Sequence, residues 1–406
     1  MQISRPVLGQ SPRLKDHCRV SARFRFDAPD SEWEDVWFEF PQHLETHIDT
    51  SGTAWVAALL PLACQRGEDL LVDAELDAEF LDNSRQLMEW YWFWKPDQMQ
   101  PVAIKAQGLS RRTAVEPERT ATFFSGGADS FFTLVRHLDV THSRDVTHLL
   151  IGHGFDLKID DTTAFDEVTT SIDAVAHQFG KTMLPFATNI RETSFGKVPW
   201  GFIGHGNAMA AAAILLSPMF GTILVPSSDG YREDKIWGTD PYLDHLFSTS
   251  NMRIVHEGSA FTRLEKVAAI ADVPGTLPHL RVCWQSWSAN NCGECEKCYR
   301  TQIAIDIVGK LSLASSFPEG KYRIENIRKI YCPADRDSAI RIYYNDMQQR
   351  AIKNGRPDIA REIGLAKRRS RLLRPLFKVK ERCLKSVKLY RLGVMLERFL
   401  AKRCLS

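Results

Sequence analysis

The sequence predicts an α/β protein built on a doubly wound parallel sheet, with an N-terminal α+β domain and a helical, basic C-terminal extension. Short β-like runs alternate with helical stretches from Thr120 onward, and such alternation implies right-handed crossovers between parallel strands. Aromatic-rich runs mark the first 118 residues, and lysine and arginine are concentrated in the last 40. We therefore expect three regions, at residues 1–118, 119–318 and 319–406.

The N-terminal region holds six of the ten tryptophans of the chain. Aromatic or alternating composition predicts three strands, at residues 36–40, 90–94 and 102–106. Helical spacing predicts two helices, at residues 54–63 and 77–87. The tryptophans would suit a stacking platform for bases or sugars, but in a segment this apolar they are more typical of a core. The polar stretch at residues 111–119 is the predicted linker.

The central region carries four apolar runs of strand length, at residues 121–124, 148–151, 182–186 and 222–226. Segments of helical length and spacing lie between them, at residues 129–138, 165–179 and 207–216. In doubly wound sheets the ligand lies outside the carboxyl ends of the strands. The loops that follow these four strands are therefore the predicted location of the chemistry.

The hexapeptide SGGADS directly follows the first of these strands and precedes a helix. Two glycines allow a tight turn, and their N–H groups, together with the dipole of the following helix, can surround a phosphate or pyrophosphate. Asp129 has the wrong charge for that role and favours Mg²⁺ coordination or loop capping. An ordinary glycine turn with a helix cap is the alternative. The residues predicted to form a nucleotide-binding loop are Ser125, Gly126, Gly127, Ala128, Asp129 and Ser130, with Asp129 acting through Mg²⁺.

Four of the nine cysteines cluster with the spacing C-x8-C-x2-C-x2-C, at Cys283, Cys292, Cys295 and Cys298. Four thiolates at short spacing can close a tetrahedral Zn²⁺ site, and with every position filled by sulfur the zinc would be structural. An iron–sulfur cluster is the main rival, and a redox or catalytic role for the cysteines is a further alternative.

Charge and hydropathy exclude several classes of protein. The net charge of +2 gives the whole chain no field suited to nucleic acid or an anionic membrane. Residues 367–406 alone carry +12, which leaves −10 for the rest. No apolar run approaches the roughly 20 residues that cross a bilayer, and the start has no apolar signal segment. We expect a cytoplasmic protein without a transmembrane segment and with reduced cysteines.

The strand–SGGxDS–helix pattern resembles the PP-loop ATP pyrophosphatases, whose adenine-nucleotide α-hydrolase fold is a Rossmann-like sheet of the HUP type. The combination with the cysteine spacing and Arg300 is similar to the 7-cyano-7-deazaguanine synthase branch of that superfamily. Gly206-Asn207, Asp240-Pro241 and the segment TRLEK at residues 262–266 add to this resemblance, which covers about residues 120–305.

The resemblance implies an ATP-dependent carbon–nitrogen ligase. A carboxylate-bearing acceptor would be adenylated with ATP and Mg²⁺, releasing pyrophosphate, and a nitrogen nucleophile would then displace AMP. By position, the SGGADS residues with Gly152 and Asn207 would bind ATP, and Asp129, Ser130 and His205 would act in catalysis. His153 and His205 would donate to phosphate, shuttle a proton or cap their loops.

The chain departs from that branch in its long flanking regions and in its substrate-facing loops, which include Gly152-His153-Gly154. Activation chemistry is therefore better supported than deazaguanine as the substrate. The acceptor is a small molecule, a polypeptide or tRNA. The alternatives are a sulfur-transfer enzyme acting on tRNA and a non-catalytic nucleotide-binding interaction protein. The basic tail would contact an acidic partner, pack on the acidic body of the chain, lie on an anionic membrane or nucleic acid, or fray.

Overall fold

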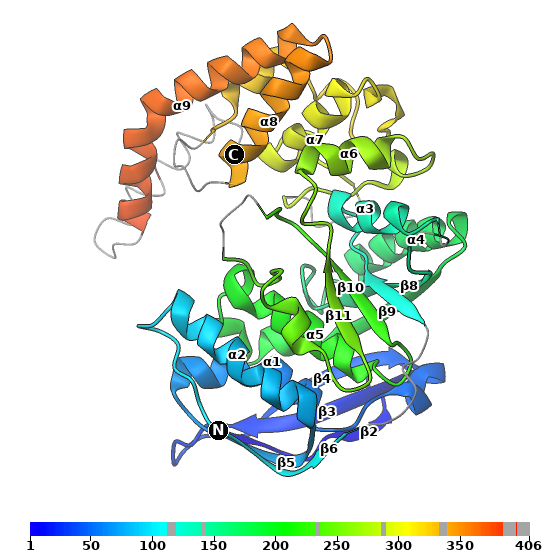
Figure 1. Cartoon of the computed structure of the whole chain (residues 1–406), viewed down its shortest axis with the longest axis vertical. Coiled ribbons are helices and arrows are strands. Elements are labelled where there is room, and N and C mark those ends of the chain that lie inside the picture. Colours follow the sequence, from blue (N-terminus) through cyan, green and yellow to red (C-terminus); the bar gives the residue numbers. More distant parts are fainter. Residues whose placement is uncertain are drawn as a thin grey trace. The chain divides into compact units, whose positions relative to one another are not determined.

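The computed structural model describes residues 1–111, 119–139, 141, 143–231, 236–285, 290–332, 339–384 and 395. Within them the protein is α/β, with a large, mostly parallel sheet (Figure 1). The predicted linker falls almost entirely on residues 112–118, outside the described residues. No described helix combines the length and the apolar character needed to cross a bilayer.

The chain divides into two compact units assembled from separate stretches, rather than from the three consecutive ranges expected. The first, called the sheet unit here, comprises Met1–Ser125, Arg136–Ser228 and Ile236–Ser259. The second, called the helical unit, comprises Gly126–Val135, Asp229–Lys235 and Ala260–Ser406. The division falls within the predicted phosphate loop: Ser125 ends the first stretch of the sheet unit, and Gly126 begins the helical unit.

The sheet unit contains one sheet with the strand order β11-β10-β7-β8-β9-β4-β3-β1-β5-β6, and β2 pairs with β3 at the side. Its strands are β1 (Gln2–Ile3), β2 (Val7–Gln10), β3 (His17–Arg25), β4 (Glu34–Pro41), β5 (Leu70–Asp77), β6 (Ile104–Ser110), β7 (Thr120–Phe123), β8 (Val146–His153), β9 (Thr182–Thr188), β10 (Thr222–Pro226) and β11 (Arg253–Glu257).

The four strands predicted for the central region are confirmed as β7, β8, β9 and β10, all parallel to their neighbours within this set. The expected helices are present as α3 (Ala128–Arg136), α4 (Thr162–Gln178) and α5 (His205–Leu215). β11 extends the parallel series beside β10 and was not predicted. The alternation of strand and helix therefore identified the parallel part of the sheet correctly.

One antiparallel junction joins the N-terminal strands to this parallel series. Phe38 and Glu39 of β4 pair with Thr188 and Ala187 of β9. The strands of the first 118 residues and those of the central region consequently form a single sheet. The strands predicted at residues 36–40 and 102–106 are present as β4 and, shifted toward the C-terminus, β6.

The strand predicted at residues 90–94 is wrong, because these residues form the last turns of α2 (Ala78–Trp94). Asp77 caps this helix by accepting a hydrogen bond from the Phe80 N–H at 3.0 Å. Helical spacing then brings the Trp90 ring within 5.6 Å of the Trp94 ring and buries Tyr91 completely. Aromatic residues suit strands and helices alike when one face is buried, so composition alone misassigned the segment.

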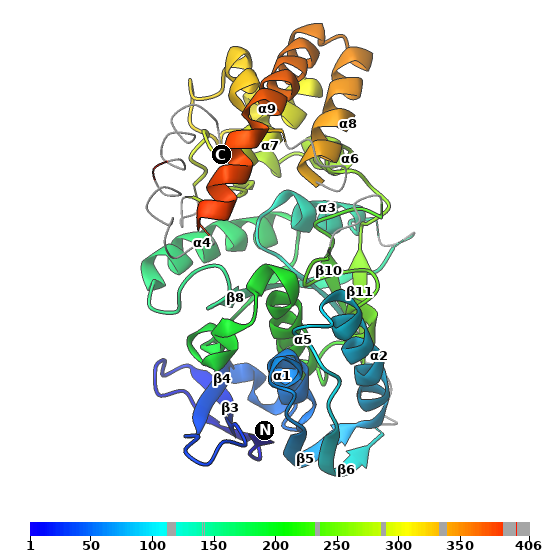
Figure 2. The same cartoon turned by 90° about the vertical axis from the view of Figure 1, so that its left-hand side faces the viewer.

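Two apolar helices lie side by side on the sheet, α1 (Thr53–Arg66) and α5 (Figures 1 and 2). Nearly every residue of both is buried. A helix that is apolar on all sides must be covered on all sides. The helix predicted at residues 54–63 is thus confirmed as a central part of the core, and the tryptophans of this region include the fully buried Trp55.

The helical unit contains α6 (Arg263–Ala271), α7 (Glu296–Ile307), α8 (Ala339–Lys353) and α9 (Pro357–Leu384) in addition to α3. The helical character predicted after residue 318 is confirmed by α8 and α9. A two-point ion pair fixes α9 to the turn at Ile324–Lys329, with Arg328 Nε and Nη2 at 2.5 and 2.7 Å from the Glu362 carboxylate. Most of the predicted basic amphipathic tail after Leu384 lies outside the described residues.

Gly206→Ala is expected to destabilise the sheet unit by about 1–3 kcal/mol, the usual cost of overpacking. A Cβ at this position would collide with the backbone carbonyl of Gly238. Gly9→Ala is the control, because no described atom lies within 4 Å of a Cβ added there. Urea unfolding of both variants checks the prediction, which equal stabilities would contradict.

Candidate functional site

The SGGADS segment forms the predicted turn and helix start. Gly126 has φ +75°, a left-handed conformation that favours glycine, and its carbonyl accepts a hydrogen bond from the Arg281 N–H at 2.7 Å. The Gly127 carbonyl accepts from the Phe131 N–H at 2.9 Å and from the Ser130 hydroxyl at 3.0 Å. The Ser130 hydroxyl therefore closes the first turn of α3, and the glycine turn leads directly into this helix.

Asp129 lies in the first turn of α3 and contacts two cations. Arg263 Nη1 is 2.5 Å from Oδ2 and Lys266 Nζ is 3.4 Å from Oδ1. Burial raises the pKa of Asp129, but Arg263, Lys266 and Lys297 outweigh it, so the net pKa lies below its ordinary value. The carboxylate is therefore charged at neutral pH. In this arrangement it neutralises cations, and coordination of Mg²⁺ stays a prediction.

Arg263 and Lys266 are positioned by the TRLEK segment that the sequence singled out. Thr262 and Glu265 form a reciprocal capping box at the start of α6: the Glu265 N–H donates to Thr262 Oγ1 at 3.3 Å, and the Thr262 N–H donates to Glu265 Oε2 at 2.8 Å. This cap fixes the first turn of α6. The Lys266 side chain is only 1% exposed, which is rare for lysine.

The start of α7 supplies two further cations. Lys297 lowers the pKa of Asp129, and the Asp129 carboxylate in turn contributes to the raised pKa of Arg300. Burial lowers the pKa of Arg300, but Glu296 and the other partners outweigh burial. Arg300 Nε lies 3.7 Å from Glu296 Oε1, one helical turn earlier. Arg263, Lys266, Lys297 and Arg300 are called the cation cluster below.

The cation cluster lies at the N-terminal ends of its helices. Its members lie within the first five residues of α6 and α7, and the two from α6 contact Asp129 in the first turn of α3. Helix N-termini carry partial positive charge and favour anions, so cations there are electrostatically unfavourable. Burial adds to that cost. Two carboxylates, Asp129 and Glu296, offset part of this charge.

The four clustered cysteines converge as predicted. Their sulfurs all lie within 4.8 Å of one another, with Sγ–Sγ distances of 3.9 Å for Cys283–Cys295 and 3.8 Å for Cys292–Cys298. With zinc–sulfur bonds of about 2.3 Å, the sulfurs of a tetrahedral site lie about 3.8 Å apart. The cysteines therefore fit a single tetrahedral metal ion such as zinc. A multinuclear iron–sulfur cluster interposes sulfide between its irons and needs wider spacing.

Backbone donors support these thiolates. Cys292 Sγ accepts from the N–H groups of Glu294 and Cys295 at 3.4 and 3.3 Å, and Cys295 Sγ accepts from the Cys298 N–H at 3.5 Å while capping α7. Gly293, at φ +74°, forms the turn between the ligands. The cysteines thereby fix the start of α7, the same turn that carries Lys297 and leads to Arg300.

Asn291, which sequence reasoning did not identify, connects the two halves of the cysteine segment. Its Oδ1 accepts from the N–H groups of Val282 and Cys283 at 2.8 and 3.1 Å. Its Nδ2 donates to the carbonyls of Leu280 and Ser316 at 2.7 and 3.1 Å. With 2% exposure and four backbone partners, Asn291 holds the first ligand beside the other three. Its position directly before the cysteine ligand Cys292 was the sequence feature that could have indicated this role.

Asn207, predicted to bind the nucleotide, makes two side-chain hydrogen bonds inside the sheet unit. Asn207 is 1% exposed, its Oδ1 accepts from the Tyr91 hydroxyl at 3.0 Å, and its Nδ2 donates to the Ala57 carbonyl at 2.7 Å. Both ends of the amide are used to join α5 to α1 and α2. Asn207 is therefore a structural residue of the sheet unit.

The other candidates in the sheet unit also make packing contacts. A Cβ on Gly152 would lie 2.6 Å from the Phe186 ring. His153 Nε2 lies 2.7 Å from the Lys158 carbonyl, and its ring stacks on Phe165 at 4.2 Å. His205 Nδ1 lies 2.8 Å from the Trp200 carbonyl. Gly152, His153 and His205 thus order their loops, and a role of His205 in catalysis stays a prediction.

The predicted site residues fall in both units. Gly126, Gly127, Ala128, Asp129 and Ser130 lie together in the helical unit with the cation cluster, which sequence reasoning did not recognise as a set. Ser125 is exposed and belongs, with Gly152, His205 and Asn207, to the sheet unit. Cations in the first turns of two helices were the signal that could have identified the cluster.

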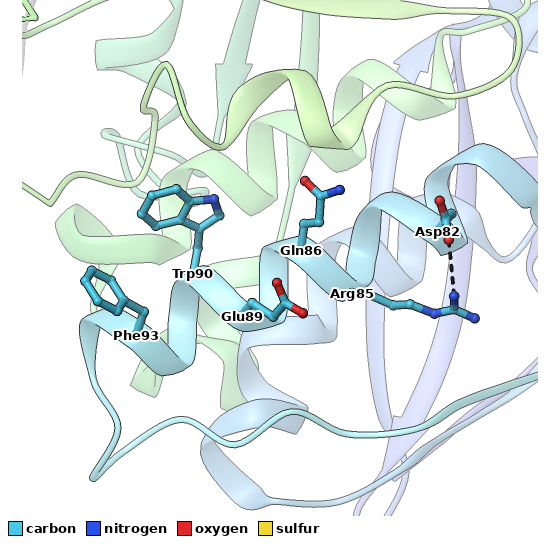
Figure 3. A pocket seen from close by; sticks show the side chains of 6 residues that line it. All are labelled: Asp82, Arg85, Gln86, Glu89, Trp90 and Phe93. Carbon is cyan, nitrogen blue, oxygen red and sulfur yellow. Dashed lines mark hydrogen bonds and ion pairs between the residues drawn. The ribbon is translucent and has the colours of Figure 1, made fainter.

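A hollow on the surface of the sheet unit lies on α2 (Figure 3). It has a volume of about 610 Å³, and one helix supplies its whole lining: Asp82, Arg85, Gln86, Glu89, Trp90 and Phe93. Arg85 and Asp82 form an exposed ion pair with an Nη1–Oδ1 distance of 3.2 Å. With one wall and mixed charge, this hollow lacks the convergent groups of a nucleotide site.

Comparison of the chain with models of protein families, with curated proteins and with solved structures finds no match.

The cysteine site predicts one zinc per chain. Cys295→Ser is expected to lose the metal and to lower the unfolding temperature markedly, because structural zinc contributes on the order of 10 kcal/mol of apparent binding energy. Cys332→Ser is the control, since Cys332 is equally buried but lies outside the cluster. Elemental analysis and thermal unfolding check the prediction. Finding iron, or no metal, in the unmodified protein would contradict it.

Proposed function

We propose that the chain is an ATP-dependent carbon–nitrogen ligase of the PP-loop type, with a HUP-type Rossmann-like sheet. A carboxylate oxygen of the acceptor attacks the α phosphorus of ATP, the bond to the β phosphate breaks, and pyrophosphate leaves. A nitrogen nucleophile then attacks the acyl carbon, AMP leaves, and the nitrogen loses a proton. Positioning of reactants and stabilisation of charge on pyrophosphate would supply most of the rate.

The cation cluster is the observation that carries this proposal. The glycine turn leads into α3, where Asp129 contacts Arg263 and Lys266 and interacts electrostatically with Lys297 and Arg300; of these cations, Lys266 and Arg300 are buried. Pyrophosphate carries several negative charges, which would stabilise both the cations and the helix N-termini. A polyphosphate offers oxygens to several cations at once, which a single phosphate or carboxylate cannot do. The arrangement therefore fits a polyphosphate better than a monoanion.

The cysteines favour a nitrogen nucleophile over sulfur transfer. A persulfide carrier needs an accessible, readily ionised thiol. The cysteines described outside the cluster, Cys18, Cys64, Cys332 and Cys383, are all buried. Burial raises the pKa of Cys64 and of Cys332 to about 12 in each case. These thiols stay protonated at neutral pH, and the four clustered thiolates would be occupied by zinc.

The metals would have separate roles. Zinc, with four sulfur ligands, has no open position for substrate and would act on the fold of the helical unit. Mg²⁺ would bind mainly through the phosphate oxygens of ATP, with Asp129 as the available carboxylate. Because Asp129 pairs with Arg263 and Lys266, it would coordinate Mg²⁺ only when phosphate replaces it beside those cations. The acceptor remains a carboxylate on a small molecule, a polypeptide or tRNA.

Incubation with α-labelled ATP, Mg²⁺, ammonium and a panel of carboxylate acceptors is expected to give AMP and pyrophosphate in equal amounts. Chromatography of the products checks this, because the two nucleotides AMP and ADP separate readily. ADP as the product would contradict cleavage between the α and β phosphates. Tight ATP binding without turnover across all acceptors would instead favour a nucleotide-binding interaction protein.

Lys266→Met is expected to weaken pyrophosphate binding about tenfold to a hundredfold, because hydrogen bonds to charged groups contribute about 1.5–3 kcal/mol. Methionine preserves most of the buried volume while removing the charge. Lys310→Met is the matched control, since Lys310 is 41% exposed and pairs with Asp272 outside the cluster. Calorimetric titration with sodium pyrophosphate measures the pyrophosphate affinity of both variants. Equal affinities would remove the cation cluster from the proposed site.

A further inference from the structure

Two consecutive tyrosines of α8 contact the charged residues at the start of α7. The Arg300 guanidinium carbon lies 4.7 Å from the centre of the Tyr343 ring, and the Tyr343 hydroxyl donates to Asp229 Oδ1 at 2.5 Å. The Tyr344 hydroxyl donates to Glu296 Oε1 at 2.9 Å. Residues 319–406 were expected to form a separate extension, yet α8 reaches the cation cluster within the helical unit.

These contacts are buried. Tyr344 is fully buried, Glu296 is 4% exposed, and Tyr343 and Arg300 are each 8% exposed. An arginine over an aromatic face is held by the quadrupole of the ring without using its N–H donors. The hydrogen bond from the Tyr343 hydroxyl to Asp229 restrains the ring at the end away from the backbone. The ring therefore offers Arg300 a restrained surface in a site where water competes little.

Arg300 keeps donor capacity despite this burial. Among the described residues, no acceptor lies within hydrogen-bonding distance of its Nε, since Glu296 Oε1 is 3.7 Å away. The Tyr344 hydroxyl bonds to that same Glu296 oxygen, so the carboxylate is shared between the phenol and the guanidinium. Stacking and a loose ion pair thus hold a buried guanidinium whose N–H groups are not consumed by protein acceptors.

We propose that Tyr343 and Tyr344 are positioning residues of the polyphosphate site, and that α8 is an integral part of it. Tyr343 holds the Arg300 plane by stacking, and Tyr344 restrains Glu296 from pairing closely with Arg300. Arg300 is thereby kept available to a polyphosphate bound in the cation cluster. The inference rests on the proposed function for the identity of the anion, and it assigns the C-terminal extension a part in binding.

The test measures pyrophosphate affinity in a double-mutant cycle on the full-length protein. Tyr343→Leu, which removes the aromatic face, is expected to raise the Kd for pyrophosphate about tenfold, the upper range for a desolvated cation–π contact. Tyr343→Phe keeps the ring and is expected to rescue most of that loss. In an Arg300→Ala background, Tyr343→Leu is expected to have little further effect, because Tyr343 acts through Arg300.

Tyr322→Leu is the matched control for lost packing. Tyr322 is a tyrosine of the same unit whose hydroxyl donates to Asp306 at 3.0 Å, outside the cation cluster. The Tyr322→Leu substitution is expected to lower the unfolding temperature without changing the Kd for pyrophosphate. If Tyr343→Leu fails to fold, Tyr344→Phe removes a single hydroxyl and is expected to raise the Kd a few-fold, again only when Arg300 is present.

The outcomes separate this inference from the proposed function. If the unmodified protein does not bind pyrophosphate, the proposed polyphosphate site is wrong, and the inference falls with it. If the unmodified protein binds and the tyrosine variants bind equally well, only the inference is overturned. Equal losses with and without Arg300 would also overturn it, since they would show an effect on packing alone.

Discussion

The contact of Asp129 with Arg263 and Lys266 is the interaction around which the helical unit is arranged. A lysine that is 1% exposed is tolerable only beside a negative charge. Asp129 supplies that charge from the turn after the glycines, so the loop, α3 and α6 are joined electrostatically as well as by the chain. The same carboxylate influences Arg300, which extends the linkage to α7. Charge balance thus constrains the first turns of three helices together.

The cysteine segment determines where α7 begins. Cys295 caps the helix, and Asn291 holds the segment at residues 280–283 through three backbone bonds and Ser316 through a fourth. A metal ion among the four sulfurs would make this turn rigid. Lys297 and Arg300 follow within five residues, so the rigidity of the cysteine site is transmitted over a short distance to the cation cluster. A structural metal and a polyanion site would therefore depend on one another without sharing a ligand.

Sequence reasoning identified features that depend on local pattern. Strands β7 to β10, the glycine turn and the converging cysteines all follow from periodicity or spacing within short segments. The pairing of β4 with β9 joins residues about 150 positions apart, and no local pattern encodes that register. The cation cluster was missed for the same reason, because Asp129, Lys266 and Arg300 meet only after folding. The contacts of Asn207 with α1 and α2 were not anticipated, because a polar residue beside glycine in a helix start suits both a ligand contact and a buried helix junction.

The cost of the cation cluster explains why the helical unit carries strong supports elsewhere. Cations at helix N-termini and a buried lysine lower its stability when no anion is bound. Charge-assisted pairs lie away from the cluster: Arg356 binds Asp306 through two nitrogens at 2.5 and 3.1 Å, and Arg328 binds Glu362 in the same way. Paired bonds of this type are among the stronger polar contacts in proteins. The Arg356–Asp306 pair ties α7 to the α8–α9 connection, and the Arg328–Glu362 pair ties α9 to the turn at Ile324–Lys329. The C-terminal helices thus stabilise the unit in which the charges of the cation cluster are unfavourable.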